Sequence, residues 1–112
     1  MEQALRLGCG FGGGIAGTAQ MCGAVTGALM ALGLAHGATS AHDRESKKKT
    51  YVVARELWRH FEERHRSLTC RDLLGVDIST AQGLETAMRS GVFKTRCPAF
   101  VRDAAEIASR LV

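Results

Sequence analysis

A long stretch without charged side chains is the feature that most constrains the fold. No Asp, Glu, Lys or Arg occurs over residues 7–35, so a membrane-spanning helix has to be considered first. The stretch is built mainly of Gly and Ala, and neither end has the aromatic or basic flank of a span. We therefore expect a Gly-rich loop over residues 8–17 and then a core helix over about residues 19–35, buried on most sides. Thr18 would cap this helix, and Gly37 in the left-handed conformation would end it.

The chain downstream of residue 43 has the periodicity of helices and none of strands. A second, basic helix is expected over about residues 44–66. Its apolar side chains recur at helical spacing: Val53, Ala54, Leu57, Trp58, Phe61 and Leu68. A short helix is expected to begin at Cys70, with Thr69 as its capping residue and Gly75 after its end.

Two more helices are expected towards the C-terminus. Residues 79–90 form one of them, ended by Gly91, and its inward side chains would be Leu84, Ala87 and Met88. The last helix opens at Cys97 and Pro98, because proline suits the first helical position and Cys97 would then be the N-cap. Its apolar stripe consists of Phe100, Ala104, Ile107, Ala108 and Leu111.

These patterns predict an all-α protein. Residues 1–112 would form a single helical domain, a small bundle of about four to five helices in which shorter helices pack around the long core helix. With 46% hydrophobic and 23% charged residues, the composition is ordinary for one globular domain. Disulfides or a metal are not needed to hold a chain of this length together.

The charge is uneven along the chain. Fifteen Lys and Arg against 11 Asp and Glu give a net charge of +4, and the basic excess lies in residues 42–71. Because charges of both signs are mixed there, we interpret the segment as a solvated helix face and expect no nucleic-acid binding. The alternative is a basic face that docks an acidic partner or a nucleic acid. The first residues lack the pattern of a secretory signal, so we expect a cytoplasmic protein with reduced thiols.

Three of the four cysteines fall at expected helix starts. Cys22 lies in the first turn or so of the core helix, Cys70 at the first position of the short helix, and Cys97 at the cap of the last. Free backbone N–H groups and the helix dipole favour an anion there, so each thiolate should be stabilised. Gly23 and Gly27, one turn apart, make a strip of small residues beside Cys22 through which a second sulfur could approach. Cys22 is therefore the thiol that we expect to react fastest.

Two other interpretations of these cysteines stay open. Free cysteines are commonly buried as small hydrophobic residues, which predicts no chemistry. Three converging thiolates could instead bind zinc or an iron–sulfur cluster, and His60 or His65 could complete a Cys/His set. No CxxC or HxxxH pair occurs, so the spacing itself predicts no metal and no resident cofactor.

Four segments together resemble the C_GCAxxG_C_C family of redox-active proteins. They are Phe11–Ile15, Cys22–Leu29 with its CGAxxG element, Cys70–Gly75, and Cys97–Pro98 followed by Val101–Ala105. The resemblance implies a small, mostly helical prokaryotic protein with redox-active cysteines. By position, Cys22 matches the cysteine of the CGAxxG element, and Cys70 and Cys97 match the two that follow it. Cys9 lies two residues before Phe11 and does not match the family's first cysteine, although it is a candidate replacement.

The hypothesis that follows is a thiol–disulfide oxidoreductase. Cys22 and one of Cys70 or Cys97 would form the working pair, with Cys9, Gly23 and Gly27 in supporting positions. The redox partner is not identified by the sequence, and the oligomeric state is open, a homodimer being one alternative. Because family members are often encoded near transporter genes, the resemblance also implies a functional link to a membrane transporter. A metal or iron–sulfur module, or a helical interaction protein with a basic docking face, are the competing hypotheses.

Overall fold

The computed structural model describes residues 1–112 and confirms the all-α class. Five helices have seven or more residues, and two shorter helices and a 3-10 turn complete the chain. In chain order the elements are α1 (Glu2–Gly8), η1 (Cys9–Phe11), α2 (Gly23–His36), α3 (Arg44–His65), α4 (Cys70–Leu74), α5 (Ala81–Ser90), α6 (Val92–Thr95) and α7 (Cys97–Ser109). No strand forms, and the only β-type pairing is an isolated bridge between Met21 and Thr69.

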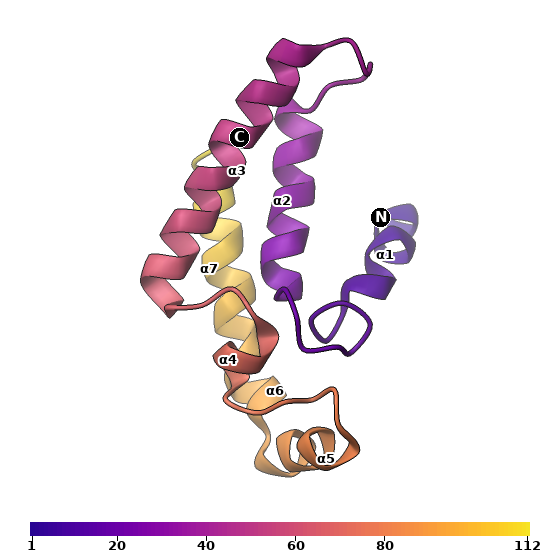
Figure 1. Ribbon diagram of the computed structural model, residues 1–112, viewed down its shortest axis with the longest axis vertical. Helices are drawn as coiled ribbons and strands as arrows, with labels where there is room; N and C mark the ends of the chain where they lie inside the picture. The colour runs from indigo at the N-terminus through magenta and orange to yellow at the C-terminus, as the bar shows by residue number, and fades with distance from the viewer.

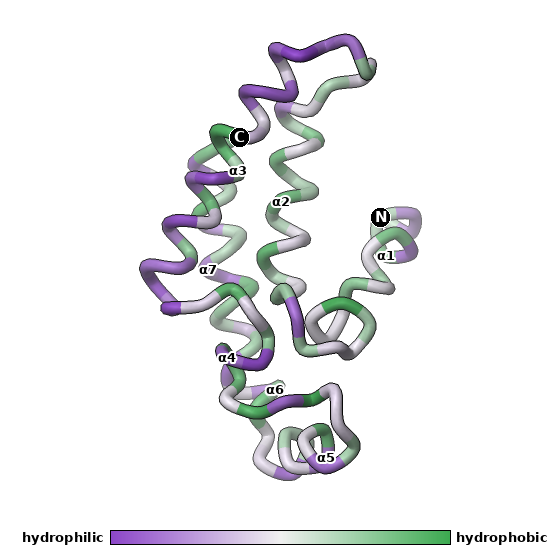
Figure 2. The backbone as a smooth tube through the Cα atoms, viewed as in Figure 1, coloured by the Kyte–Doolittle hydropathy of each residue, from purple (hydrophilic) through white to green (hydrophobic).

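Helices α2, α3 and α7 form the centre of the molecule and pack against one another (Figure 1). Val25 and Leu32 of α2 and Leu57 and Phe61 of α3 are fully buried between them. Figure 2 shows α3 as mostly hydrophilic with apolar positions between the charged ones, as expected for a helix with one face on the core. The rings of Phe61 and Phe100 of α7 meet edge to face at 6.4 Å.

The core helix is shorter and more exposed than its apolar sequence predicts. It begins at Gly23 rather than near residue 19, because the backbone at Ala19 has a left-handed φ of 61° and Cys22 occupies the N-cap. Thr18 does not cap it, and its hydroxyl donates to the carbonyls of Gly14 and Ile15. Only one side of α2 is buried, so the expectation of burial on most sides is wrong: the side chain of Leu34 is 93% exposed.

The end of α2 also differs from the prediction. Gly37 does follow the helix, but its backbone is extended (φ −66°, ψ 154°) rather than left-handed. The chain then continues away from the helix axis instead of folding back in the tight motif of a left-handed cap. His36, the last helical residue, lies 2.6 Å through Nε2 from the carbonyl oxygen of Leu111, which ties this end of α2 to the end of α7.

The basic helix α3 matches its predicted bounds closely. The Asp43 side chain caps its start by accepting from the amide of Ser46 at 3.1 Å, and Arg66 ends it in the left-handed conformation. Part of the mixed charge pairs along the helix, since Arg59 lies 2.8 Å from Glu56 and 3.0 Å from Glu63. Exposed pairs of this kind add little to stability. Leu57, Phe61 and Leu68 of the predicted stripe are buried, whereas Trp58 is largely exposed.

The C-terminal helices confirm some positions and correct others. Thr69 caps α4, and Gly75 and Gly91 take the left-handed conformation after α4 and α5. In α5 only Ala87 is buried; Leu84 and Met88, expected inward, are exposed because this helix lies at one end of the molecule and packs mainly on α6.

Helix α6 had no counterpart among the predicted elements. Cys97 is the first residue of α7 rather than its cap, a position that Arg96 takes. The predicted stripe of α7 is otherwise correct, with Phe100, Ala104, Ile107 and Ala108 buried and Leu111 partly so.

The first helix contributes nothing to the core. Helix α1 buries none of its residues and continues directly into η1. None of the helices combines the length and the apolar character needed to cross a bilayer.

Candidate functional site: a thiol cluster under a strained loop

The loop expected over residues 8–17 is irregular only in its second half: Gly8 ends α1, Cys9–Phe11 form η1, and a left-handed turn follows. Five consecutive residues have positive φ: Gly13, Gly14, Ile15, Ala16 and Gly17. The turn is held by backbone hydrogen bonds that include Ala16 N–H to Gly10 O at 2.8 Å and Gln20 N–H to Gly14 O at 2.8 Å. For the β-branched Ile15 this conformation is a genuine outlier. Such strain persists only when the surroundings impose it, and it is concentrated at functional sites.

Gly14 lies directly against one of the cysteines. A Cβ at this position would be 2.8 Å from Cβ of Cys70, and only 2.5 Å from the backbone nitrogen of Gln20. Together with its φ of +70°, this makes glycine the residue that fits. The strained turn therefore packs on the Cys70 side chain.

A bridge between two connecting segments joins Cys22 to Cys70. The bridge pairs Met21 with Thr69 in antiparallel fashion. Cys22 N–H donates to Leu68 O at 2.8 Å, and Cys70 N–H donates to Gln20 O at 2.6 Å. Cys22 and Cys70 thus each follow a bridge residue, and in extended pairing successive side chains alternate between the two sides. Both cysteines are buried in the same core.

Cys97 completes the group of three thiols. It is half-buried at the start of α7 and packs against the same core cluster that contains Cys22 and Cys70. The three are near enough that a negative charge on Cys22 raises the pKa of both Cys70 and Cys97. All four cysteines are free thiols in this structure.

Burial, rather than the helix dipole, determines the direction in which the pKa of two of these thiols is shifted. Loss of solvation raises the pKa of Cys70 to about 11, with further contributions from the neighbouring Cys22 and Cys97. Burial likewise raises the pKa of Cys97, and the charge of Cys22 adds to the effect. The expectation that a helix start stabilises the thiolate is therefore wrong for both: Cys70 is buried at the start of the five-residue α4, and at Cys97 the loss of solvation outweighs the start of α7.

Cys22 has a different environment. It is the N-cap of the 14-residue α2, where the backbone N–H groups of the first turn lack helical partners, and its own side chain makes no capping hydrogen bond. Its side chain is buried, with 9% of the residue's surface exposed. Of the three thiols, Cys22 therefore lies at the start of the longest helix.

The supporting residues divide into two groups. A Cβ at Gly23 would lie 3.4 Å from the carbonyl oxygen of Phe11, so this glycine lets the end of η1 approach the residue next to Cys22. Gly27 meets nothing within 4 Å and lines an apolar hollow between α2 and α7, so no second sulfur approaches through it. Cys9 is exposed in η1, outside the buried core.

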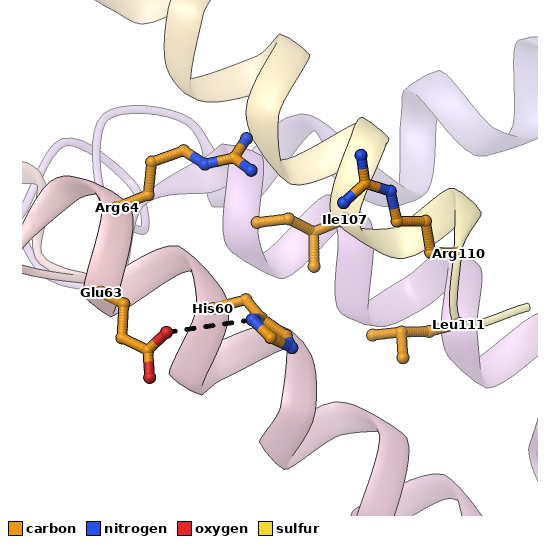
Figure 3. A pocket seen from close by; sticks show the side chains of 6 residues that line it. All are labelled: His60, Glu63, Arg64, Ile107, Arg110 and Leu111. Carbon is orange, nitrogen blue, oxygen red and sulfur yellow. Dashed lines mark ion pairs between the residues drawn. The ribbon is translucent and has the colours of Figure 1, made fainter.

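The histidines do not join the cysteines. His60 lies 3.3 Å from Glu56 and 4.0 Å from Glu63, beside a hollow lined also by Arg110 (Figure 3). His65 Nε2 is 2.8 Å from a carboxylate oxygen of Asp103. The two residues are 38 positions apart, so no local sequence pattern predicts this pair. No group of three or more His, Cys, Asp or Glu residues has an arrangement that could hold a metal ion.

The protein is thus small and helical, with two buried thiols and one half-buried thiol in or against the same core. A family model described as "Putative redox-active protein (C_GCAxxG_C_C)" matches residues 1–111. The chain belongs to this family, which confirms the resemblance found in its sequence. No curated protein and no solved structure matches the chain.

Proposed function

We propose that this protein is a thiol–disulfide oxidoreductase whose working pair is Cys22 and Cys70. The observation that carries the proposal is the Met21–Thr69 bridge: Cys22 and Cys70 are the residues that follow its two partners, and the amide of each donates across the bridge. Membership of a family described as redox-active supports the same conclusion. In this proposal the thiols alone carry the electrons. The chemistry suits a reducing compartment such as the cytoplasm, where thiols are kept reduced.

The exchange begins at Cys22. Its thiolate attacks one sulfur of a disulfide in the redox partner, forming a mixed disulfide and releasing the partner's other sulfur as a thiolate. Cys70 then gives its proton to the thiolate released in the first step and attacks the Cys22 sulfur, which breaks the mixed disulfide and releases the second partner sulfur as a thiolate that takes a proton from water. The partner gains two electrons and becomes a dithiol, while Cys22 and Cys70 become a disulfide. A dithiol reductant returns the pair to the reduced state by the reverse exchange.

The raised pKa values of Cys70 and Cys97 support this order of events. The thiolate is the nucleophile in thiol–disulfide exchange, and at neutral pH both of these groups are protonated. A high thiol pKa suits the second step, in which Cys70 is held next to its target and needs only local deprotonation. Cys97, close to both, is the alternative resolving thiol.

Access to the pair depends on the strained turn. Cys22 and Cys70 are both buried, and Gly14 covers the Cys70 side chain. Exposure of Cys70 therefore requires the turn, residues 13–17, to move away from it. The left-handed residues of this segment lower the cost of that movement, because the strain is released when the turn opens.

Exchange with oxidised glutathione, followed by intact mass, tests the proposal. We expect the reduced wild-type protein to pass through a mixed disulfide and then lose two hydrogens as the internal disulfide forms. C70S should accumulate the mixed disulfide, C22S should lose the fast phase, and C9S, in which the exposed cysteine is replaced, should behave as wild type. An internal disulfide that forms equally well in C70S and fails in C97S would transfer the resolving role to Cys97. A reaction that depends only on Cys9 would contradict the proposal.

A further inference from the structure

A hollow of about 480 Å³ lies where the end of α3 meets α4 and the start of α7. Four of its lining residues are basic: Arg64, His65, Arg66 and Arg96. They come from two segments far apart in the sequence, so the folded chain gathers them. Of the lining residues only Asp72 carries a carboxylate, and it accepts a hydrogen bond from the Ser67 hydroxyl at 3.1 Å. The hollow is therefore electropositive.

Two of the guanidinium groups have no charged partner. Asp103 compensates Arg64, at 3.4 Å, and contacts His65 at 2.8 Å. Arg66 and Arg96 form no ion pair with any carboxylate of the protein. Their positive charges are free to bind an anion, and a guanidinium fork matches both phosphate and carboxylate oxygens.

The two residues are also held in place. Arg96 donates from Nη1 to the carbonyl oxygen of Leu73 at 3.1 Å, and both residues line the hollow, so this hydrogen bond fixes the guanidinium there. Arg66 ends α3 with a φ of 68°, a conformation that glycine adopts at lower cost than arginine. The glycines that follow α4 and α5 occupy this same conformation. An arginine in such a position carries a conformational cost that glycine would not.

We propose that this hollow is a binding site for a small anion bearing a phosphate or carboxylate group, with Arg66 and Arg96 as the binding residues. The site goes beyond the proposed function and needs none of the thiols. A concave site with two free guanidinium groups fits a compact anionic group. A duplex nucleic acid would instead require basic residues spread along an extended surface.

Calorimetric titration of the reduced full-length protein tests the site. Inorganic phosphate and citrate are titrated separately at constant ionic strength, with sodium chloride as the reference salt. The pocket variant is R66G/R96Q, and the matched control is R44Q/R55Q, which removes the same charge from two exposed arginines of α3 that form no ion pair. We expect saturable binding of at least one anion. Loss of charge-assisted hydrogen bonds should weaken it at least about tenfold in R66G/R96Q, with less than about twofold change in R44Q/R55Q.

Separate titrations distinguish a phosphate-bearing ligand from a carboxylate-bearing one, and separate variants distinguish failure of this site from failure of the thiol chemistry. Binding of phosphate alone indicates a phosphate-bearing ligand, and binding of citrate alone indicates a carboxylate-bearing one. R66G replaces an arginine in the left-handed backbone conformation with glycine, so it should remain folded, and it should bind the anion more weakly than wild type. C22S/C70S should bind as wild type, so this site can fail or succeed independently of the thiol chemistry. Absence of saturable binding, equal loss in both double variants, or binding of duplex DNA alone would overturn the proposal.

Discussion

Replacing Gly14 with alanine tests whether the strained turn and the thiol cluster are one structural unit. The added Cβ would lie 2.5 Å from the backbone nitrogen of Gln20 and 2.8 Å from Cβ of Cys70, at a residue whose φ is +70°. The left-handed conformation costs an L-residue about 1–2 kcal/mol. Overpacking against neighbours that cannot move freely costs about 1–3 kcal/mol. Gly14→Ala should therefore lower the free energy of unfolding by about 2–5 kcal/mol.

A loss of that size is a large part of the stability of a small domain, which is about 5–15 kcal/mol. It is measured by urea unfolding of the reduced protein, followed by far-UV circular dichroism. Gly10→Ala is the matched control, because a Cβ there meets nothing within 4 Å and its φ is not positive. The control should change stability by less than about 1 kcal/mol, since only the unfolded-state entropy of one glycine is affected. A loss below about 1 kcal/mol in Gly14→Ala would refute the close packing of the turn on Cys70.

Three further outcomes follow from the same structure. Arg66→Gly should raise the free energy of unfolding by about 1 kcal/mol, because glycine carries no penalty at a φ of 68°; an unchanged or lower urea midpoint would contradict this. Alkylation of Cys70 at pH 8 should be slower than alkylation of the exposed Cys9, and its rate should increase up to about pH 11; equal rates at pH 8 would contradict the burial of Cys70. Because the folded protein favours the neutral Cys70 thiol, the free energy of unfolding should fall as pH rises from 9.0 to about 11. Hydrogen bonds from the hydroxyl and amide of Ser79 lower the pKa of Asp77, so the stability they give is present above pH 3.8 and lost as pH falls further; Asp77→Asn should flatten this acid limb in a pH series of urea midpoints.

Local signals in the sequence were sufficient for several elements of the fold. Thr69 and Gly75 delimit α4 as their side-chain and backbone preferences predict. Leu57 and Phe61 are buried at the spacing that identified α3. In each case a preference of the residue itself agrees with its surroundings, which is why the local pattern predicted them.

Other features arise only from tertiary packing. Ile15 has no intrinsic preference for a left-handed backbone, so its place in the turn could not be predicted. The Met21–Thr69 bridge joins two irregular segments through a single pair, and a single pair leaves no periodic pattern. Met88 has the spacing of a core residue but lies on a helix with little to pack against. The burial that raises the pKa of Cys70 is likewise a property of the assembled core.

The family membership and the positions of the three cysteines were both accessible from the motif, and the family match covers residues 1–111. What the motif could not supply is which thiols are neighbours. The bridge joins the segments that precede Cys22 and Cys70, through backbone hydrogen bonds that leave no sequence motif. Cys97 enters the same core through α7.

The pairing of Cys22 with Cys70 is tested most directly by disulfide mapping. The intact protein is equilibrated in glutathione buffers of increasing oxidation, free thiols are trapped by alkylation, and the linked peptides are identified by mass spectrometry. We expect a Cys22–Cys70 disulfide that appears and disappears reversibly with the redox poise, while Cys9 is trapped as a free or glutathione-capped thiol. Absence of any Cys22–Cys70 linkage across the series, with the protein still folded, would contradict the assignment of this pair.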